Sequence, residues 1–279
     1  MTPTTTTTLG PGKRARRLRA ELRLLAESGT SGAPVPMHRL TQELSVSVAT
    51  VRRDLADLEA QGLVVRTHGG ARISASAVEL PVRLRAGTSP EVKRLIARRA
   101  ATFLPEGPFA VAIGGGTTAA EVARALVFRA ELTILTNSLT TAAEIGARQN
   151  LRVLVTGGIV RPSSFEIVGA LAESSFAALN IGIAFLGADG VSSPGGVTTH
   201  DEVEARTNAA MVAGAQRSVL VVDSSKIGRV TLARVVDLAA VDDVVTDDGA
   251  SVADLRGIEQ AGPRVHVVQR VGHRVGHHA

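Results

Sequence analysis

The 279-residue sequence contains no cysteine, no tryptophan and no tyrosine, and aromatic residues make up only 2% of it. The absence of cysteine excludes disulfides and thiolate metal sites, and it fits a cytoplasmic location. With so few aromatic residues, base stacking is a poor basis for binding nucleic acid, so duplex DNA is favoured over single strands. The sequence also lacks a signal-peptide core and any uninterrupted run of about 20 apolar residues, which predicts a soluble chain without membrane contact.

Positive charge is concentrated in the N-terminal quarter of the chain. Residues 1–72 hold 11 Lys and Arg against 6 Asp and Glu, whereas the remaining residues hold 20 of each, so the net charge of +5 lies in that quarter. A concentrated basic surface attracts a phosphate backbone. Five cations dominate the cluster and form either a solvated tail and helix face or a set of phosphate contacts: Lys13, Arg14, Arg16, Arg17 and Arg19.

A DNA-recognition helix is predicted after Ser47, whose hydroxyl can cap an unpaired N–H group at the helix start. Val51, Leu55 and Leu58 recur at helical spacing and form an apolar face. Outside that face, near the helix start, lie the small, polar and basic side chains typical of a helix that contacts the major groove: Ala49, Thr50, Arg52 and Arg53. Residues 62–71 are typical of a hairpin with glycines in its turn. A recognition helix followed by such a hairpin indicates a winged helix-turn-helix.

Two further helices are predicted upstream. The first carries its apolar stripe at Leu18, Leu22 and Leu25, and the second spans about residues 37–44 with Leu40 and Leu44 as core contacts. We therefore expect five segments along the chain: a disordered tail over residues 1–12, a winged helix-turn-helix domain over 13–75, a linker over 76–90, an α/β domain over 91–268 and a flexible tail over 269–279.

Beyond residue 91, apolar runs alternate with amphipathic helical segments, a pattern typical of a mostly parallel sheet covered by helices. Polar and glycine residues follow the apolar runs, and ligands bind at that edge of open α/β sheets. We therefore expect a single ligand crevice there. Six strands are predicted, over residues 110–113, 132–135, 152–155, 183–186, 219–222 and 244–245.

The glycine-rich turn after the first predicted strand is the main candidate for an anion site. Residues 114–118, Gly-Gly-Gly-Thr-Thr, open a helix expected over 119–126, so backbone N–H groups and the helix dipole converge there. A phosphate would fit this turn. The alternative is a tight turn with capping threonines and no ligand. Short polar or flexible residues follow the next two strands: Asn137, Ser138, Gly157 and Gly158.

The N-terminal motifs resemble the DNA-binding domain of the DeoR-type family of bacterial transcriptional repressors. The family signature V-S-x-x-T-[IV]-R-R-D-L corresponds to residues 46–55, and the run R-T-H-G-G-A at residues 66–71 corresponds to its wing. A basic helix with an ordinary surface hairpin is the alternative. The resemblance implies duplex operator DNA as partner, and helix-turn-helix proteins generally pair two half-sites as homo-oligomers. The implied DNA contacts are Ser47, Ala49, Thr50, Arg52, Arg53, His68 and Arg72.

The order of the later loops is similar to the C-terminal sensor domain of the same family, which resembles ribose-phosphate isomerases in fold. The resemblance implies that a phosphorylated sugar or related metabolite releases the repressor from carbohydrate-metabolism genes. By that likeness the phosphate is held by Gly115, Gly116, Thr117 and Thr118, hydroxyls by Asn137 and Asp201, and a negative oxygen by Lys226. Ser138, Gly157 and Gly158 complete the implied site. Alternatively, Lys226 is a solvated surface lysine, and Asp201 and Glu204 are first-turn helix acids.

Two departures from the family pattern leave the ligand's identity open. Gly114 stands where the family usually has an acidic residue, and Thr207-Asn208, following Arg206, replaces the usual basic pair. The competing hypothesis is a sugar-phosphate isomerase or hydrolase fused to a DNA-binding module, with Asp189, Asp201 or Glu204 as general base. Fold similarity does not imply retained chemistry, so we expect no enzyme. No cofactor or metal is expected, and we interpret His273, His277 and His278 as part of a mobile end.

Overall fold

The structure is a computed structural model that describes residues 14, 17, 18, 20–22, 24, 25, 34–60, 62–74 and 89–270. The chain divides into two compact units, residues 1–88 and 89–279. Several expectations lie wholly or largely outside the described residues: the tail over 1–12, the linker over 76–90, most of the tail over 269–279, and the side chains of Lys13, Arg16, Arg19, His273, His277 and His278.

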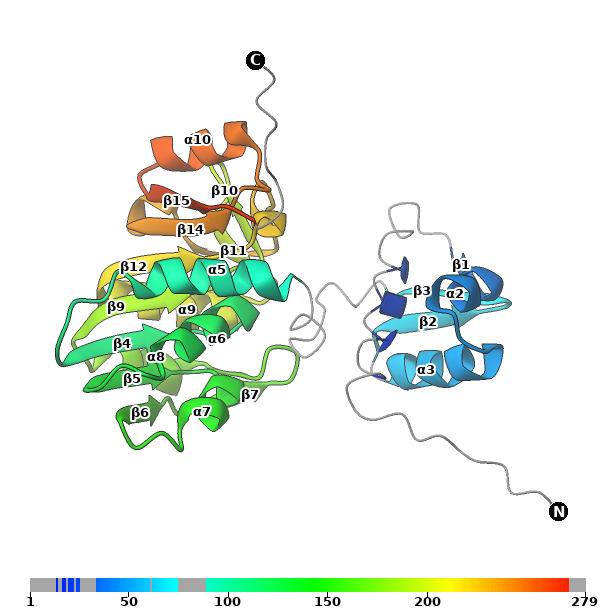
Figure 1. The fold of residues 1–279 in the computed structure, drawn as a ribbon, viewed down its shortest axis with the longest axis horizontal. Coiled ribbons are helices and arrows are strands. Elements are labelled where there is room, and N and C mark those ends of the chain that lie inside the picture. Colours follow the sequence, from blue (N-terminus) through cyan, green and yellow to red (C-terminus); the bar gives the residue numbers. More distant parts are fainter. Residues whose placement is uncertain are drawn as a thin grey trace. The chain divides into compact units, whose positions relative to one another are not determined.

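The first unit joins helices to a small antiparallel sheet (Figure 1). The described residues between 14 and 25 are helical, and their Leu22 and Leu25 are buried with Leu40, Val51 and Leu55 in one core. The predicted apolar faces are therefore confirmed. The elements that follow are β1 (Val35–Pro36), α2 (Met37–Leu44), α3 (Val48–Ala60), β2 (Val64–Thr67) and β3 (Gly70–Ile73), with the strands in the order β1-β3-β2.

The first half of the second unit alternates helices with strands and adds one hairpin. In chain order its elements are α5 (Pro90–Ala101), β4 (Phe109–Ile113), α6 (Thr117–Leu126), β5 (Leu132–Thr136), α7 (Leu139–Ile145), β6 (Leu151–Val155), β7 (Ile159–Arg161), β8 (Glu166–Val168) and α8 (Ala170–Ala177). β7 and β8 pair antiparallel and form a two-stranded hairpin apart from the main sheet.

The second half begins with the central strand of the main sheet. Its elements are β9 (Ile181–Leu186), β10 (Gly190–Ser192), β11 (Gly196–Thr199), α9 (Glu202–Ala213), β12 (Ala215–Val221), η2 (Ser224–Lys226), β13 (Ala233–Val236), η3 (Leu238–Ala240), β14 (Asp243–Asp247), α10 (Val252–Gln260) and β15 (Arg264–Val268). β10, β11 and β13 form a small antiparallel sheet.

The main sheet of the described chain is parallel throughout, with the order β15-β14-β12-β9-β4-β5-β6. The six predicted strands are confirmed as β4, β5, β6, β9, β12 and β14, although Val222 falls just after β12. Strand order reverses between β4 and β9, because the chain first proceeds outward to β6 and then returns to the other side of β4. Ligands of open α/β sheets generally bind at the carboxyl ends of the two strands at such a reversal.

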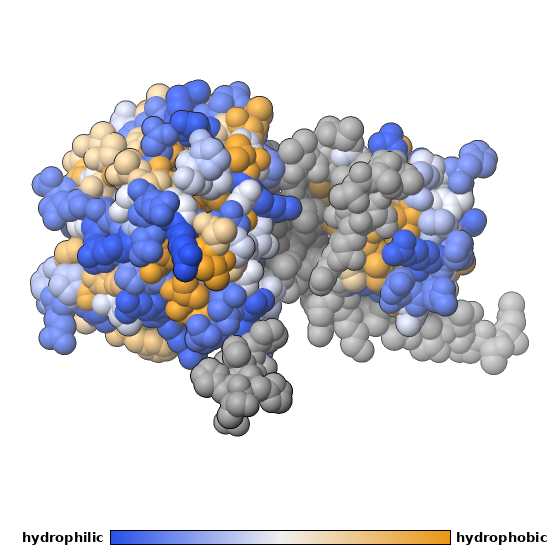
Figure 2. Space-filling model, turned by 90° about the horizontal axis from the view of Figure 1, so that it is seen from above, coloured by the Kyte–Doolittle hydropathy of each residue, from blue (hydrophilic) through white to orange (hydrophobic). Residues whose placement is uncertain are grey.

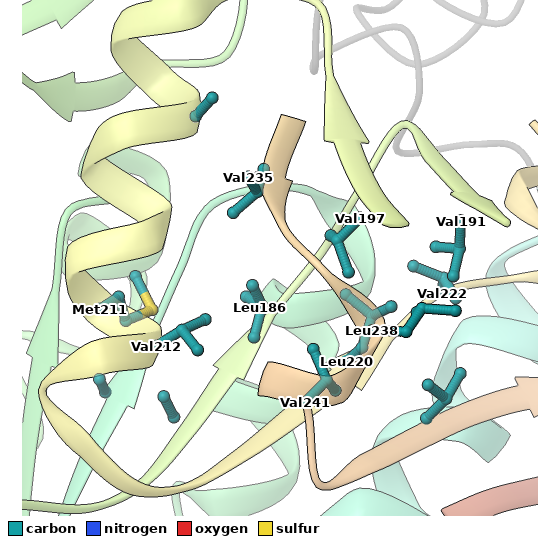
Figure 3. Close-up of a cluster of buried hydrophobic side chains, with 14 of the residues drawn as sticks. Leu186, Val191, Val197, Met211, Val212, Leu220, Val222, Val235, Leu238 and Val241 are labelled. Atoms are coloured by element: carbon teal, nitrogen blue, oxygen red, sulfur yellow. The ribbon is translucent and has the colours of Figure 1, made fainter. Parts of the chain in front are cut away.

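Helices cover both faces of the main sheet, with α5 and α6 on one face and α8 and α9 on the other (Figure 1). Val111 and Ile113 of β4 enter the core beneath α5 and α6, whereas Ala112 belongs to the opposite core. Figure 3 shows the latter core, where Met211 and Val212 of α9 lie near Leu186 of β9. Because both faces are buried, the strands are apolar runs, which is why they could be predicted.

One strand of this unit was not predicted, and one expectation is wrong in detail. Residues 196–199 form the strand β11, because Val197, Thr198 and Thr199 are β-branched and fully or almost fully buried. The helix after the glycine turn begins at Thr117 rather than at residue 119, since Gly116 is its N-cap.

The surface of the described residues is mixed in polarity. Figure 2 shows apolar side chains in separate groups among hydrophilic ones on the face that it presents. No helix within the described ranges is both long and apolar enough to cross a bilayer.

Candidate functional site: the recognition helix and the glycine turn

The start of α3 has the features expected of a recognition helix. The backbone N–H of Thr50 donates to the Ser47 hydroxyl at 3.2 Å, which confirms Ser47 as a cap. The Ser47 and Thr50 hydroxyls are also 2.9 Å apart. Ala49, Arg52 and Arg53 are exposed on the side opposite the buried Val51 and Leu55.

Most of the cationic side chains expected to contact DNA are exposed to solvent. Neither Arg52 nor Arg53 forms an ion pair with any residue that the structure describes. His68 is exposed at the β2–β3 turn, and Arg72 is half-buried on β3. Arg66, in contrast, is held by Glu59 of α3 through a 2.6 Å contact, which ties the hairpin to the helix.

Two of the five N-terminal cations have a structural role instead of the phosphate contacts considered above. Arg17 donates to both carboxylate oxygens of Asp54, with Nη2 3.1 Å from Oδ1, and Arg14 donates to Asp57. Asp54 is only 1% exposed. These pairs join the first helix to α3, so the Asp of the R-R-D-L run positions the recognition helix rather than contacting DNA.

In the second unit, the glycine turn lies at the carboxyl end of β4, beside β9. The Gly114 N–H donates to the Phe185 carbonyl at 2.9 Å, which joins the ends of the two strands. Gly116 has φ 88°, a left-handed conformation that favours glycine, and α6 begins directly after it. The turn therefore presents helix N–H groups at the point where the strand order reverses, as an anion site requires.

Glu166 and Asn137 lie next to this turn. The Glu166 carboxylate packs against Gly115 so closely that a Cβ on Gly115 would collide with it. Asn137, at the end of β5, donates from Nδ2 to Glu166 Oε2 at 3.3 Å. Both side chains are almost fully buried.

Charged groups of β7, α9, η2 and the loop after β9 form a continuous network with Thr199 of β11. Arg161 Nε lies 3.2 Å from Asp201 Oδ2, and its Nη1 lies 3.0 Å from Glu204 Oε2. The Thr199 hydroxyl contacts Glu204 at 2.5 Å and Asp189 at 3.2 Å. Lys226 Nζ completes the chain at 3.2 Å from Asp189 Oδ1. The network is buried or half-buried, so its ion pairs restrict how its members can move.

Asp201 is held in position by hydrogen bonds from the start of α9 as well as by its ion pair in the network. It caps α9 by accepting the N–H groups of Val203 and Glu204, both at 2.9 Å. Burial disfavours its charged form, but the Glu204 N–H and the Arg161 guanidinium outweigh burial and hold the pKa of Asp201 below its ordinary value. Asp201 is thus both the N-cap of α9 and an ionised member of this network.

The remaining predicted ligand residues divide into two groups. Ser138 is the N-cap of α7 and accepts the Thr141 N–H at 3.2 Å, so its hydroxyl has a structural partner. Gly157 and Gly158 are exposed after β6, which lies two strands away from β4 at the end of the sheet. Thr117, Thr118 and Asn137 lie nearer the reversal point.

The sequence reasoning missed Arg161 and Glu166, which belong to the β7–β8 hairpin. Both are charged side chains with little exposure, and only the fold shows that the hairpin lies beside the glycine turn. The sequence did contain a signal for this hairpin, because Arg161 and Glu166 each stand next to two β-branched apolar residues in a short stretch. Among the described residues, no group of three or more His, Asp or Glu has an arrangement that could hold a metal ion.

Comparison with known proteins identifies the family to which both units belong. The DeoR-like helix-turn-helix domain matches residues 22–77, and the DeoR C terminal sensor domain matches residues 88–248. The fold and these matches define a transcriptional regulator with a DNA-binding domain and a sensor domain. The chain belongs to the DeoR family of transcriptional repressors.

Relatives cover most of the chain. The glycerol-3-phosphate regulon repressor of Escherichia coli K12 is 35% identical over 213 residues, covering 76% of this chain and 84% of the relative. The HTH-type transcriptional regulator GlpR of Haloferax volcanii is 36% identical over 256 residues, covering 91% of this chain and 97% of the relative. These relatives are named as regulators, in agreement with the expectation that the chain is not an enzyme.

Among solved structures, ribose 5 phosphate isomerase A from Neisseria gonorrhoeae is similar at 17% identity and a TM-score of 0.35. The match covers 53% of this chain and 56% of the isomerase. A likeness at this level carries no conclusion about activity.

Proposed function

We propose that this repressor binds duplex operator DNA through α3 and the β2–β3 hairpin and is released by a phosphorylated sugar or related metabolite. In this proposal residues 13–75 bind DNA, and residues 91–268 bind the ligand. Two features of the chain carry the proposal. On α3, exposed arginines form no ion pair with any described residue, and in the second unit a glycine turn opens α6 at the strand reversal.

The DNA contacts follow from exposure on the recognition helix and hairpin. Arg52 and Arg53 would reach base edges or phosphates, and Ser47, Ala49 and Thr50 would approach the major groove. His68 and Arg72 would contact the backbone from the hairpin. Since a helix-turn-helix domain commonly binds one half-site, we propose that a homo-oligomer binds the complete operator.

The proposed ligand contacts follow from the geometry of the glycine turn and the neighbouring strand ends. The N–H groups at the start of α6 would hold the phosphate, and Thr117 and Thr118 would add hydroxyl donors. Asn137 and Asp201 would bind hydroxyl groups. Lys226 is already paired with the almost fully buried Asp189, so we assign it the role of orienting that carboxylate toward the ligand.

The ligand must favour one arrangement of the repressor over another. It can weaken DNA binding only through different affinities for the DNA-binding and released states. The β7–β8 hairpin links the glycine turn to α9, because Glu166 contacts the turn while Arg161 pairs with Asp201 and Glu204.

A thermal-shift screen tests the ligand assignment directly, because a ligand that binds only the native state raises its stability by mass action. The panel should contain phosphorylated sugars, their unphosphorylated forms and glycerol 3-phosphate. We expect stabilisation by a phosphorylated compound and none by its unphosphorylated form. Stabilisation by the neutral sugar alone would contradict a phosphate site at the glycine turn.

A further inference from the structure

Glu21 is a buried acid in the DNA-binding unit. It lies on the first helix, next to the core residue Leu22, and it is fully buried. Neither of its carboxylate oxygens, Oε1 or Oε2, forms a hydrogen bond with any residue that the structure describes. Burial of a charged group without a partner is costly, so this position favours the protonated form of the carboxyl group.

Two charged groups act on Glu21, one from each of two helices. The Asp54 carboxylate of α3 repels the ionised form of Glu21, and Arg17, four residues earlier on the first helix, attracts it. Arg17 is already paired, because its guanidinium donates to both oxygens of Asp54. Arg14 Nε lies 3.8 Å from the same carboxylate. Asp54 therefore already uses the cation that an ionised Glu21 would need.

The other elements of this unit contribute apolar side chains to the core. Leu40 is the buried residue of α2, and the strands contribute Val35, Val64 and Ala71. Glu21 and Asp54 are the only ionisable side chains that are buried in the described part of this unit. The charged and titratable side chains of α2 are all exposed: His38, Arg39 and Glu43.

Ionisation of Glu21 would place two carboxylates beside Arg17, between the first helix and α3. Burial, aided by Asp54, raises the pKa of Glu21 from 4.5 to about 8. Between these two pH values, an arrangement that exposes Glu21 to water releases a proton that the packed arrangement retains. The packing of the first helix on α3 therefore weakens as the pH rises from 4.5 to about 8, and it changes little above that pH.

We propose that Glu21 is a pH-sensitive switch of DNA binding: with its proton the first helix packs on α3, and without it the first helix separates and operator affinity falls. The Arg17–Asp54 pair transmits the change, because it joins the two helices beside Glu21. This inference rests on the proposed contact between α3 and DNA and adds a mode of regulation to it. The repressor would release its operator as its surroundings become alkaline, without any ligand.

The pH dependence of DNA affinity tests the switch in the full chain. Affinity for a duplex selected from a random-sequence pool would be measured by fluorescence anisotropy from pH 6 to pH 9 at constant ionic strength. Glu21→Gln keeps the shape of the side chain and carries no titrating proton. We expect the affinity of the wild type to fall at least five-fold more than that of Glu21→Gln between pH 6 and pH 8.5.

Other groups that titrate in this range are the same in both proteins, so the ratio of the two affinities isolates Glu21. They are the histidines and the terminal amino group, since the chain has no cysteine or tyrosine. Glu43→Gln removes an exposed acid of α2 and should leave the pH dependence of the wild type unchanged.

Calorimetry follows the proton itself. Titrations at pH 7.5 in two buffers of different ionisation enthalpy give the number of protons that the chain takes up when it binds DNA. We expect the wild type to take up more than Glu21→Gln or the apolar variant Glu21→Leu, by up to one proton. Equal uptake, or a wild-type affinity that is constant from pH 6 to pH 8.5, would overturn the inference and leave the proposed function intact. If the wild type selects no duplex at any pH, the proposed function itself is wrong.

Discussion

The two units use arginine in opposite ways. On α3, Arg52 and Arg53 are exposed and form no ion pair with a described residue, whereas in the second unit Arg161 is 14% exposed and lies against two carboxylates. An exposed cation loses little when it meets a phosphate backbone and remains free to do so. A buried cation without partners would be costly, so Arg161 serves to hold a shape. The comparison separates side chains that contact a partner from side chains that maintain the site.

The first unit contains the same contrast within one helix. Arg53 and Asp54 are neighbours in sequence, yet Arg53 faces solvent and Asp54 is buried against Arg17. Sequence proximity therefore says little about role here. Substitutions should distinguish the two classes by whether they change stability or binding.

Asp54→Asn should produce the largest effect. It leaves the Arg17 guanidinium, itself largely buried, without its charged partner, so the free energy of unfolding of the first unit should fall by about 3–5 kcal/mol. Asp57→Asn is the matched control, because Asp57 is 42% exposed and its ion pair should contribute less than about 1 kcal/mol. Urea unfolding followed by circular dichroism measures both, and equal losses would show that Asp54 is not the structural member of the pair.

Thr117→Leu should abolish the response to ligand while leaving DNA binding intact. The bulky side chain fills the space at the start of α6 and removes a hydroxyl donor. Release of DNA by the cognate phosphorylated compound, followed by fluorescence anisotropy, should disappear at concentrations that saturate the wild type. Thr102→Leu, an exposed position after α5, should respond normally. A folded Thr117→Leu protein with a wild-type response would place the phosphate elsewhere.

Arg53→Ala should weaken specific DNA binding by about 1–3 kcal/mol if the side chain contacts a base edge. A phosphate contact would instead weaken all duplexes alike and reduce the salt dependence of binding by about one ion. Measuring affinity across salt concentrations separates these outcomes. Arg94→Ala, which removes an exposed cation of α5, should leave the affinity unchanged. Wild-type affinity in Arg53→Ala protein at every salt concentration would remove Arg53 from the interface.

Glu21→Gln should change the pH dependence of stability. Burial, aided by the nearby Asp54 carboxylate, raises the pKa of Glu21 from 4.5 to about 8. The folded state then retains a proton that the unfolded state releases above pH 4.5, so the free energy of unfolding should fall as the pH rises from about 4.5 to 8. Gln carries no titrating proton, and its stability should be flatter over this window. Identical pH profiles for the two proteins would show that Glu21 is not the titrating group.

Much of the fold could be predicted because its main helices and strands have recognisable local patterns of apolar residues in the sequence. The strands of the sheet are apolar runs, and α3 displays its apolar face at helical spacing. β15 escaped prediction because Arg264 and His266 interrupt its apolar residues at the end of the sheet. The β7–β8 hairpin and β11 are too short for periodicity to identify them.

The site was predictable only where its chemistry is contiguous in sequence. The glycine turn and its helix form one segment, so their place at a strand end could be expected. Glu166 contacts Asn137, which lies 29 residues earlier in the chain. Arg161 contacts Asp201, and the whole of β9 lies between these two residues in the sequence. Such contacts depend on the order of the strands, which a single sequence does not reveal.

The most direct test of the account is ligand-dependent release of DNA by the full chain. A duplex selected by the protein from a random-sequence pool would be titrated with repressor, and the complex would then be challenged with phosphorylated compounds and their unphosphorylated forms. We expect a phosphorylated compound to release the wild-type protein and to leave the Thr117→Leu complex intact, while the neutral sugar releases neither. Release of both proteins at the same concentration, or of the wild type by the neutral sugar alone, would contradict a repressor controlled through the glycine turn.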